Sequence, residues 1–70
     1  MSGVYKVIEL VGCSGTSWEE AARTAVETAS KTLKDLRIAE VTRQDLTIKD
    51  GKVEEYRVRL KISFKYHSEE

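Results

Sequence analysis

The feature that most constrains this chain is a long alternation near its C-terminus. Between Tyr56 and Tyr66, apolar and aromatic side chains alternate with basic and polar ones, which is the period of a strand with one buried face. An Asp50-Gly51 pair precedes this stretch and is a strong signal for a tight hairpin turn. A second extended stretch, Leu36–Lys49, comes before the turn. The sequence therefore predicts two antiparallel strands of about 13 residues, each able to reach roughly 43 Å.

The first strand of this hairpin changes its apolar parity partway along. Ala39 and Val41 share one parity, whereas Leu46 and Ile48 share the other. An extra residue on one strand, which is a β-bulge, produces such a change. We expect the bulge within Thr42–Asp45.

Two further elements precede the hairpin. The stretch Val4–Val11 carries apolar side chains on both faces, as expected of a strand that is covered on two sides. Gly12–Gly15 then interrupts it. Ser17, with Glu20 three positions later, forms a capping-box pattern that marks the start of a helix. We expect a helix of about 18 residues, or roughly 27 Å, along the apolar stripe Trp18, Ala21, Ala22, Ala25, Val26, Ala29, Leu33 and Leu36.

The order strand, helix, strand, strand predicts an α+β fold. With a right-handed crossover and the last strand between the other two, it forms a β-α-β-β unit, in which a three-stranded antiparallel sheet carries one helix on one face. Because the helix is shorter than the hairpin, part of the hairpin and one face of the sheet are left without cover. A neighbouring subunit is the simplest way to bury them.

The size and composition of the chain also favour association with other copies. Its 70 residues allow one domain, residues 1–70, and a domain of this size is only marginally stable alone. Cys13 is the only cysteine, so the chain has no internal disulfide. Cys13 and the single histidine, His67, are too few for a Cys/His zinc site.

The charge pattern excludes several kinds of partner. Lysine and arginine total 12, aspartate and glutamate total 12, and the formal net charge is +0. Nucleic-acid and membrane-surface binders carry a basic excess that is missing here. No apolar run approaches the roughly 20 residues needed to span a bilayer, and Met1–Lys6 lacks the apolar region of a signal peptide. With the free thiol, these features favour a cytoplasmic location.

The sequence holds no recognisable set of catalytic residues. Gly12–Thr16 is close to the G-x-S-x-G pattern, but it ends in threonine and lacks a histidine partner. His67 has no evident orienting residue. The same loop could offer backbone N–H groups to an anion, although a turn leading into a helix cap is the favoured interpretation. We therefore expect a protein that is not an enzyme.

Four basic residues share one face of the last predicted strand: Arg57, Arg59, Lys61 and Lys65. One interpretation is a stripe that holds anionic ligands inside an oligomer. The favoured interpretation is an ordinary polar strand face, balanced by acids on neighbouring strands such as Glu9 and Glu40.

Oxygen ligands for a metal ion are present but scattered. The acidic candidates are Asp45, Asp50, Glu54 and Glu55. They do not form an EF-hand loop, so a calcium site would have to be assembled from several strands or subunits. Exposed turn carboxylates are the alternative interpretation.

Three segments of the chain resemble the dodecin family. They are VYKVIELVG (Val4–Gly12), SWEEAA (Ser17–Ala22) and YRVRLKISFK (Tyr56–Lys65), and the resemblance continues in order over nearly the whole chain. It implies a β-α-β-β subunit in a hollow homododecamer of cubic symmetry. It also implies the binding and buffering of small molecules, chiefly flavins such as FMN and riboflavin, without catalysis.

The resemblance places two substitutions in the family's flavin pocket. Ile38 lies where flavin-binding dodecins carry a stacking Trp, and Arg57 lies where they carry a Gln that hydrogen-bonds the flavin. Ile38 lacks a planar π surface, and Arg57 donates hydrogen bonds but cannot accept them. Flavin binding in the usual mode is therefore expected to be weak or absent. Trp18 lies on the helix, and we expect it to anchor the helix or to lie in an interface rather than to stack on a cofactor.

A branch of the family lacks that stacking Trp and is described as calcium dodecin. This sequence is similar to it at Ser17–Glu19, Arg37–Ala39 and Gln44-Asp45. Asp45, near the predicted bulge, is the best single candidate for a calcium ligand. We therefore expect a storage or binding protein for calcium or another small ligand. The alternatives are a scaffold without a ligand and a flavin-binding dodecin that uses a different stacking residue.

Overall fold

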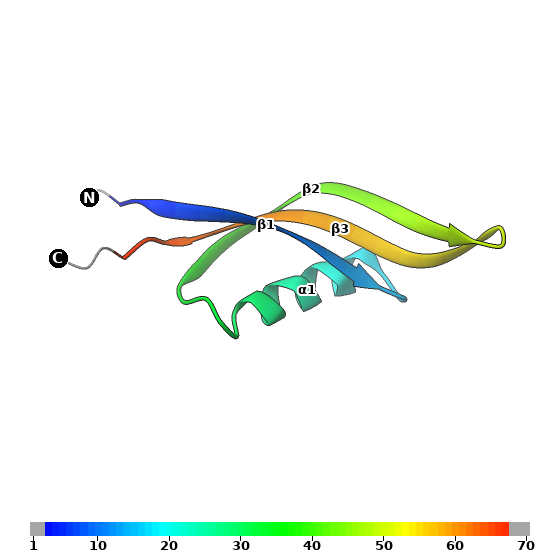
Figure 1. The fold of residues 1–70 in the computed structure, drawn as a ribbon, viewed down its shortest axis with the longest axis horizontal. Coiled ribbons are helices and arrows are strands. Elements are labelled where there is room, and N and C mark those ends of the chain that lie inside the picture. The colour runs from blue at the N-terminus through cyan, green and yellow to red at the C-terminus, as the bar shows by residue number, and fades with distance from the viewer. Residues whose placement is uncertain (1–2, 68–70) are drawn as a thin grey trace.

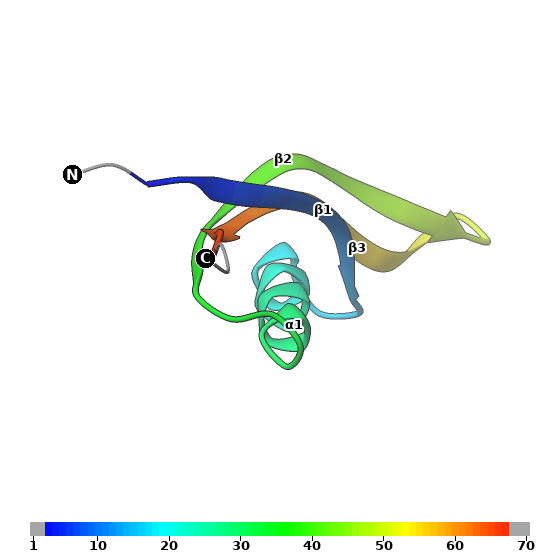
Figure 2. The same ribbon diagram turned by 60° about the vertical axis from the view of Figure 1, so that its left-hand side comes forward.

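The chain folds in the predicted order of strand, helix, strand, strand. The computed structural model describes residues 3–67, so the predicted domain 1–70 extends beyond them at both ends. The elements are β1 (Tyr5–Ser14), α1 (Trp18–Ala29), β2 (Leu36–Lys49) and β3 (Lys52–Lys65). The strands form one antiparallel sheet in the order β1-β3-β2, and α1 lies against one face of it (Figures 1 and 2). The predicted α+β fold, with the last strand in the centre, is confirmed.

The hairpin turn forms as predicted. Asp50 has a φ of 53° and Gly51 a φ of 74°, and Lys49 pairs with Lys52 across the turn. Positive φ at both central residues is what a type I′ turn requires, and an Asp-Gly pair tolerates it well. The turn joins two strands of 14 residues each.

A bulge in β2 changes the parity of this strand, also as predicted. The register with β3 shifts between Val41 and Arg43, which leaves Thr42 as the extra residue. Val41 pairs with the buried Leu60 before the bulge, and Leu46 lies on the same face after it. Two further shifts, near the two ends of β2, were not predicted.

The helix begins where the capping box predicts. The hydroxyl of Ser17 accepts a hydrogen bond of 3.0 Å from the backbone N–H of Glu20. This bond satisfies one of the free N–H groups at the helix start.

Within residues 3–67, no helix is both long and apolar enough to cross a bilayer.

The helix ends earlier than predicted. α1 has 12 residues and stops at Ala29, with Ser30 as its C-cap, whereas the apolar stripe suggested about 18 residues. The hydroxyl of Ser30 donates to the carbonyl of Glu27 at 2.8 Å, and a polar turn follows. Leu33 and Leu36 still pack against the core, from this turn and from the start of β2. Their contacts with the core explain why their spacing imitated a longer helix.

The core lies between α1 and the centre of β3. Its apolar side chains are Val58, Leu60 and Ile62 of β3 and Ala21, Ala25 and Ala29 of α1. The helix approaches closely because its inner face is alanine and because β1 carries Gly12 opposite it. A Cβ at Gly12 would lie 2.3 Å from the carbonyl oxygen of Ala21 and 3.0 Å from the Cβ of Ala25.

The helix covers only part of the sheet. Twelve helical residues span about 18 Å, whereas the longest dimension of the described chain is 55 Å. Figure 1 shows the hairpin extending past α1 at one end, with the start of β1 and the end of β3 at the other. Ile48 and Val53 on this overhang are 70% and 49% exposed. The predicted mismatch between helix and hairpin is therefore confirmed.

The substitution Gly12→Ala should loosen the packing of the helix on the sheet. Its methyl group would collide with the backbone of Ala21, which cannot move without shifting α1. Overpacking of this kind destabilises by about 1–3 kcal/mol. Urea unfolding followed by circular dichroism measures the effect at a fixed protein concentration. Gly15→Ala is the matched control, because a Cβ at Gly15 has no neighbour within 4 Å. Equal stability of the two variants would contradict the account.

Candidate functional site

The face of the sheet that points away from α1, here called the outer face, is open. Val58, Leu60 and Ile62 point toward the helix, so the residues that alternate with them on β3 point outward. Strand pairing aligns these outward residues in rows across β1, β3 and β2. The rows are the ion-pair row (Cys13, Arg57, Asp45), the arginine row (Val11, Arg59, Arg43), the acidic row (Glu9, Lys61, Glu40) and the apolar row (Val7, Ser63, Ile38).

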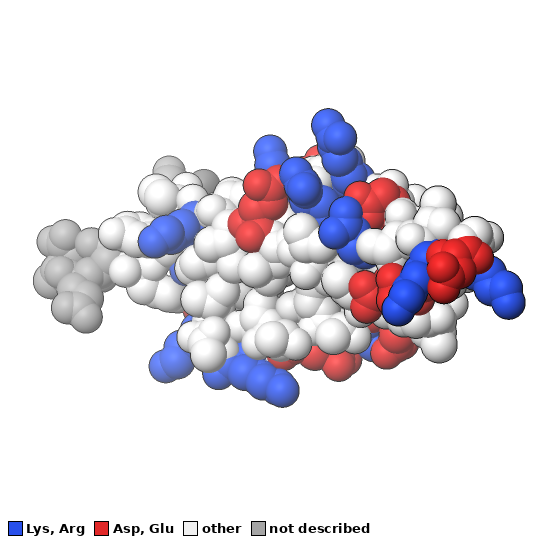
Figure 3. All heavy atoms as spheres, turned by 45° about the vertical axis from the view of Figure 1, so that its right-hand side comes forward, with Lys and Arg blue, Asp and Glu red and all other residues white. Residues whose placement is uncertain are grey.

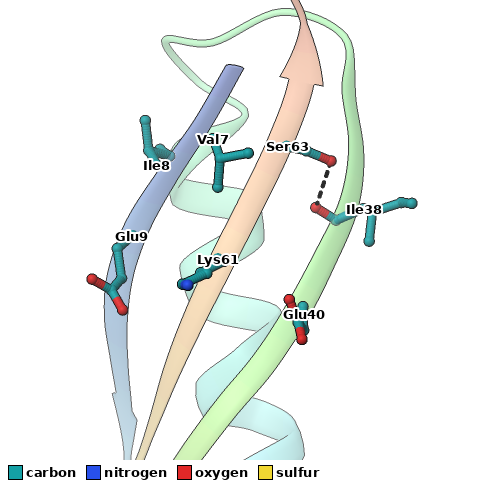
Figure 4. A pocket seen from close by; sticks show the side chains of 7 residues that line it. All are labelled: Val7, Ile8, Glu9, Ile38, Glu40, Lys61 and Ser63. Atoms are coloured by element: carbon teal, nitrogen blue, oxygen red, sulfur yellow. Dashed lines mark hydrogen bonds between the residues drawn. The ribbon is translucent and has the colours of Figure 1, made fainter. Parts of the chain in front are cut away.

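An open hollow of about 500 Å³ lies over the acidic and apolar rows. In Figure 4, Glu9 and Glu40 stand on either side of Lys61. The hydroxyl of Ser63 donates to the carbonyl of Ile38 at 3.5 Å. The Ile38 side chain itself is 66% exposed. The lining of the hollow therefore combines apolar side chains with two carboxylates and one ammonium group.

Asp45 and Arg57 form a bidentate ion pair at the other end of the outer face. The Nε and Nη2 groups of Arg57 donate to the two carboxylate oxygens of Asp45 at 2.8 and 2.9 Å. These hydrogen bonds are the main reason that the pKa of Asp45 lies below its ordinary value of 3.8. Desolvation opposes the shift, and the positive charges of Arg57, Arg59 and Arg43 add to it. The hydrogen bonds to Asp45 likewise raise the pKa of Arg57.

Trp18 anchors the helix start to the hairpin, as the sequence suggested. Its indole N–H donates to the backbone carbonyl of Asp45 at 3.2 Å. Its ring packs edge-to-face on Tyr56, with the ring centroids 5.3 Å apart and the planes at 82°. The indole thus fixes the segment of β2 that carries the ion pair.

The two positions implied for a flavin pocket do not meet within one subunit. Ile38 belongs to the apolar row and Arg57 to the ion-pair row. Arg57 lies six positions before Ser63 on β3, which separates these rows by roughly 20 Å. Arg57 is also engaged by Asp45. The residues of one subunit therefore do not fit a stacked flavin.

The surroundings of Asp45 do not fit a calcium ion within one subunit either. Calcium takes 6–8 oxygen ligands, whereas both Asp45 oxygens accept hydrogen bonds from Arg57, and Arg43 and Arg59 add positive charge nearby. In the part of the chain that the structure describes, no group of three or more His, Cys, Asp or Glu side chains is placed to hold a metal.

The basic residues on the outer face of β3 have different neighbours. Lys61 has Glu9 and Glu40 on the two neighbouring strands, as the interpretation of a balanced face requires. Arg57 is paired with Asp45, which sequence reasoning had not matched to it. Arg59 lies opposite another cation, Arg43. Figure 3 shows Lys and Arg side chains, with Asp and Glu among them, along the side of the molecule away from α1.

His67 has an orienting partner that the sequence did not reveal. Its Nε2 lies 2.6 Å from Oδ2 of Asp35, so the expectation that no residue orients it was wrong. The hydrogen bond to His67 is the main cause that lowers the pKa of Asp35. Asp35 itself has a φ of 61° in the turn before β2. The exposed pair holds the C-terminal segment against that turn.

The fold defines a class: small α+β proteins in which one helix covers one face of a three-stranded sheet with central β3. The sequence profile of the dodecin family matches residues 4–67 of the chain. A calcium dodecin from Mycobacterium tuberculosis is 45% identical over 62 residues, which cover 89% of this chain and 87% of that protein. A dodecin from Thermus thermophilus is 42% identical over 65 residues, which cover 93% and 94%.

Solved structures agree with this result. Dodecin from Streptomyces coelicolor superposes with a TM-score of 0.91 at 39% identity, covering 96% of both chains. The structure of calcium dodecin from Mycobacterium tuberculosis, described as a calcium-chelating antigen with a novel calcium-binding site, gives 0.82 at 44% identity and the same coverage. The chain is therefore a member of the dodecin family.

The ion pair between Asp45 and Arg57 should make part of the stability depend on pH in the acid range. Because the folded state lowers the pKa of Asp45 below 3.8, its contribution is complete above that value and disappears as pH falls through the lowered pKa. Asp45→Asn should reduce the melting temperature only slightly at pH 7, since the side chains of Asp45 and Arg57 are both about half exposed. The melting temperature of this variant should also fall less steeply than that of the wild type as the pH is lowered. Asp50→Asn, the same change at the hairpin tip, is the control.

Thermal melts of the wild type and both variants from pH 7 to pH 2 provide the measurement. Parallel curves for the wild type and Asp45→Asn throughout the acid range would show that the ion pair does not contribute.

Proposed function

We propose that this protein is a non-enzymatic, small-ligand binding and storage protein of the cytoplasm that works as a homododecamer. Residues 1–70 would form one domain per subunit. The observation that carries the proposal is the open outer face of a dodecin fold, which pairs a hollow of about 500 Å³ with exposed apolar side chains. The exposed thiol of Cys13 supports the cytoplasmic assignment.

Exposed apolar residues support assembly through the overhang and the outer face. Patches of this kind on a single chain mark interaction surfaces. The large exposed hydrophobic residues on these two surfaces are Tyr5, Val7, Val11, Ile38, Ile48 and Val53. Several subunits meeting at these surfaces would also bring together residues that are far apart in one chain, such as Ile38 and Arg57.

The ligand we propose is calcium or another small ligand rather than a stacked flavin. Ile38 offers no aromatic surface, and Arg57 is held by Asp45. Similarity to the calcium dodecin of Mycobacterium tuberculosis supports calcium. Asp45 remains the proposed ligand residue. The other oxygens would come from neighbouring subunits, since residues 3–67 of one subunit hold no group of three or more His, Cys, Asp or Glu side chains placed for a metal.

A purely structural scaffold is the second candidate function. It is favoured by the same ion pair, which leaves neither Asp45 nor Arg57 free for a ligand. A flavin-binding dodecin with a different stacking residue has weaker support, because Trp18 is engaged with Asp45 and Tyr56.

Flavin binding should appear when the two substituted positions are reversed. We expect FMN fluorescence to be quenched by the double variant Ile38→Trp/Arg57→Gln and little affected by the wild type. Each stacked ring pair contributes about 0.5–1.5 kcal/mol beyond the area it buries. Ile48→Trp is the matched control, because it adds an indole at the hairpin tip. Strong quenching by the wild type would overturn the assignment against flavin.

The same wild-type samples report on calcium. A ligand that binds only the folded protein raises its melting temperature, so calcium should raise it and a chelator should reverse the rise. The scaffold interpretation predicts no response to either calcium or FMN. A response to calcium that is lost in Asp45→Asn but kept in Asp50→Asn would support Asp45 as a ligand.

A further inference from the structure

One row of the outer face carries two positive charges and no acidic residue. Arg59 of β3 and Arg43 of β2 are directly paired across the antiparallel ladder, and the third member of the arginine row is the apolar Val11. Within residues 3–67, neither arginine takes part in an ion pair. Directly opposed side chains have Cβ atoms about 5 Å apart, and like charges in this position are destabilising.

The neighbouring rows differ in this respect. Arg57 is neutralised by the bidentate contact with Asp45. Lys61 stands between Glu9 and Glu40. The acidic row therefore carries one more negative than positive charge. Among these four rows, an excess of positive charge is found in the arginine row alone.

The fold holds the two arginines in place. The bulge at Thr42 moves the following residues of β2 by one position, which puts Arg43 on the outer face, since a one-residue shift exchanges the two faces of a strand. The hydroxyl of Thr42 donates to the backbone carbonyl of Arg59 at 3.2 Å. This bond ties the bulge to the partner arginine.

We propose that Arg43 and Arg59 together bind a dianionic phosphate group, either inorganic phosphate or the phosphate of a small phosphomonoester. Two guanidinium groups present forked N–H donors that match phosphate oxygens, and a dianion neutralises both charges. Acids lie in both neighbouring rows. Arg57 occupies both oxygens of Asp45, and Glu9 and Glu40 lie on either side of Lys61. This inference rests on the proposed ligand-binding function and names a ligand class for the outer face.

Calorimetric titration of the assembled protein with inorganic phosphate, against sodium chloride at equal ionic strength, tests the proposal. Phosphate should bind with measurable heat, and Arg43→Gln and Arg59→Gln should each weaken binding by about tenfold or more, since hydrogen bonds between charged groups are individually strong. Lys65→Gln is the matched control: it removes one positive charge from the same strand and should leave the affinity unchanged.

A second readout does not depend on added ligand. Without phosphate, Arg43→Gln and Arg59→Gln should melt at a higher temperature than the wild type, because each removes the repulsion between opposed cations. If either variant fails to assemble, Arg59→Lys replaces it as the test. This variant keeps the positive charge but lacks the forked N–H donors of the guanidinium group, and it should bind phosphate more weakly than the wild type. Affinities that are equal in the wild type and the arginine variants, or a phosphate response no larger than that of chloride, would overturn the proposal.

The source of the phosphate is decided by titrating glycerol phosphate beside inorganic phosphate. Tighter binding of the ester indicates a phosphomonoester ligand, and equal or weaker binding indicates free phosphate. Light scattering on the same samples distinguishes a failure of the phosphate site from a failure of the proposed function. A dodecamer without a phosphate response overturns only this site, whereas a monomer overturns the proposed function.

Discussion

The structure depends on a mismatch in length between one short helix and one long hairpin. α1 has 12 residues, whereas each hairpin strand has 14 residues and rises more than twice as far per residue. Close packing of alanines and Gly12 brings α1 tightly onto the centre of the sheet and gives the subunit a small core. The remainder of the hairpin and the whole outer face are left exposed. In a chain of 70 residues with so little buried surface, these uncovered surfaces are where stabilisation by other copies has to come from.

The same hairpin organises the chemistry of the outer face. Pairing across three strands turns an alternating sequence into rows whose charges differ sharply: a closed ion pair, two opposed arginines, a lysine between two glutamates, and an apolar row beside the hollow. The closed ion pair explains why neither a stacked flavin nor a calcium ion fits the residues of one subunit. The arginine row is the row with an excess of positive charge, and it is where we propose that a phosphate group binds.

The sequence was sufficient for the element order, the hairpin turn and the bulge, because each has a local signal. Asp50-Gly51 specifies the turn, and the change of parity between Val41 and Leu46 locates the bulge. The end of α1 was missed because Leu33 and Leu36 contact the core without being helical. The pair of Asp45 with Arg57 was missed for a different reason: counting back from the turn crosses an unpredicted register shift between Thr47 and Ile48. Since one residue of shift exchanges the faces of a strand, cross-strand partners could be assigned only from the structure.

We infer that a single subunit is incomplete and that its overhang and outer face are completed by other copies. Size-exclusion chromatography with multi-angle light scattering tests this most directly, because it measures molar mass independently of shape. The described chain is elongated, at 55 × 20 × 14 Å, so a mass inferred from elution volume alone would be wrong. The account predicts one peak with the mass of a dodecamer of 8.0 kDa chains. A stable, folded monomer at micromolar concentration would contradict it.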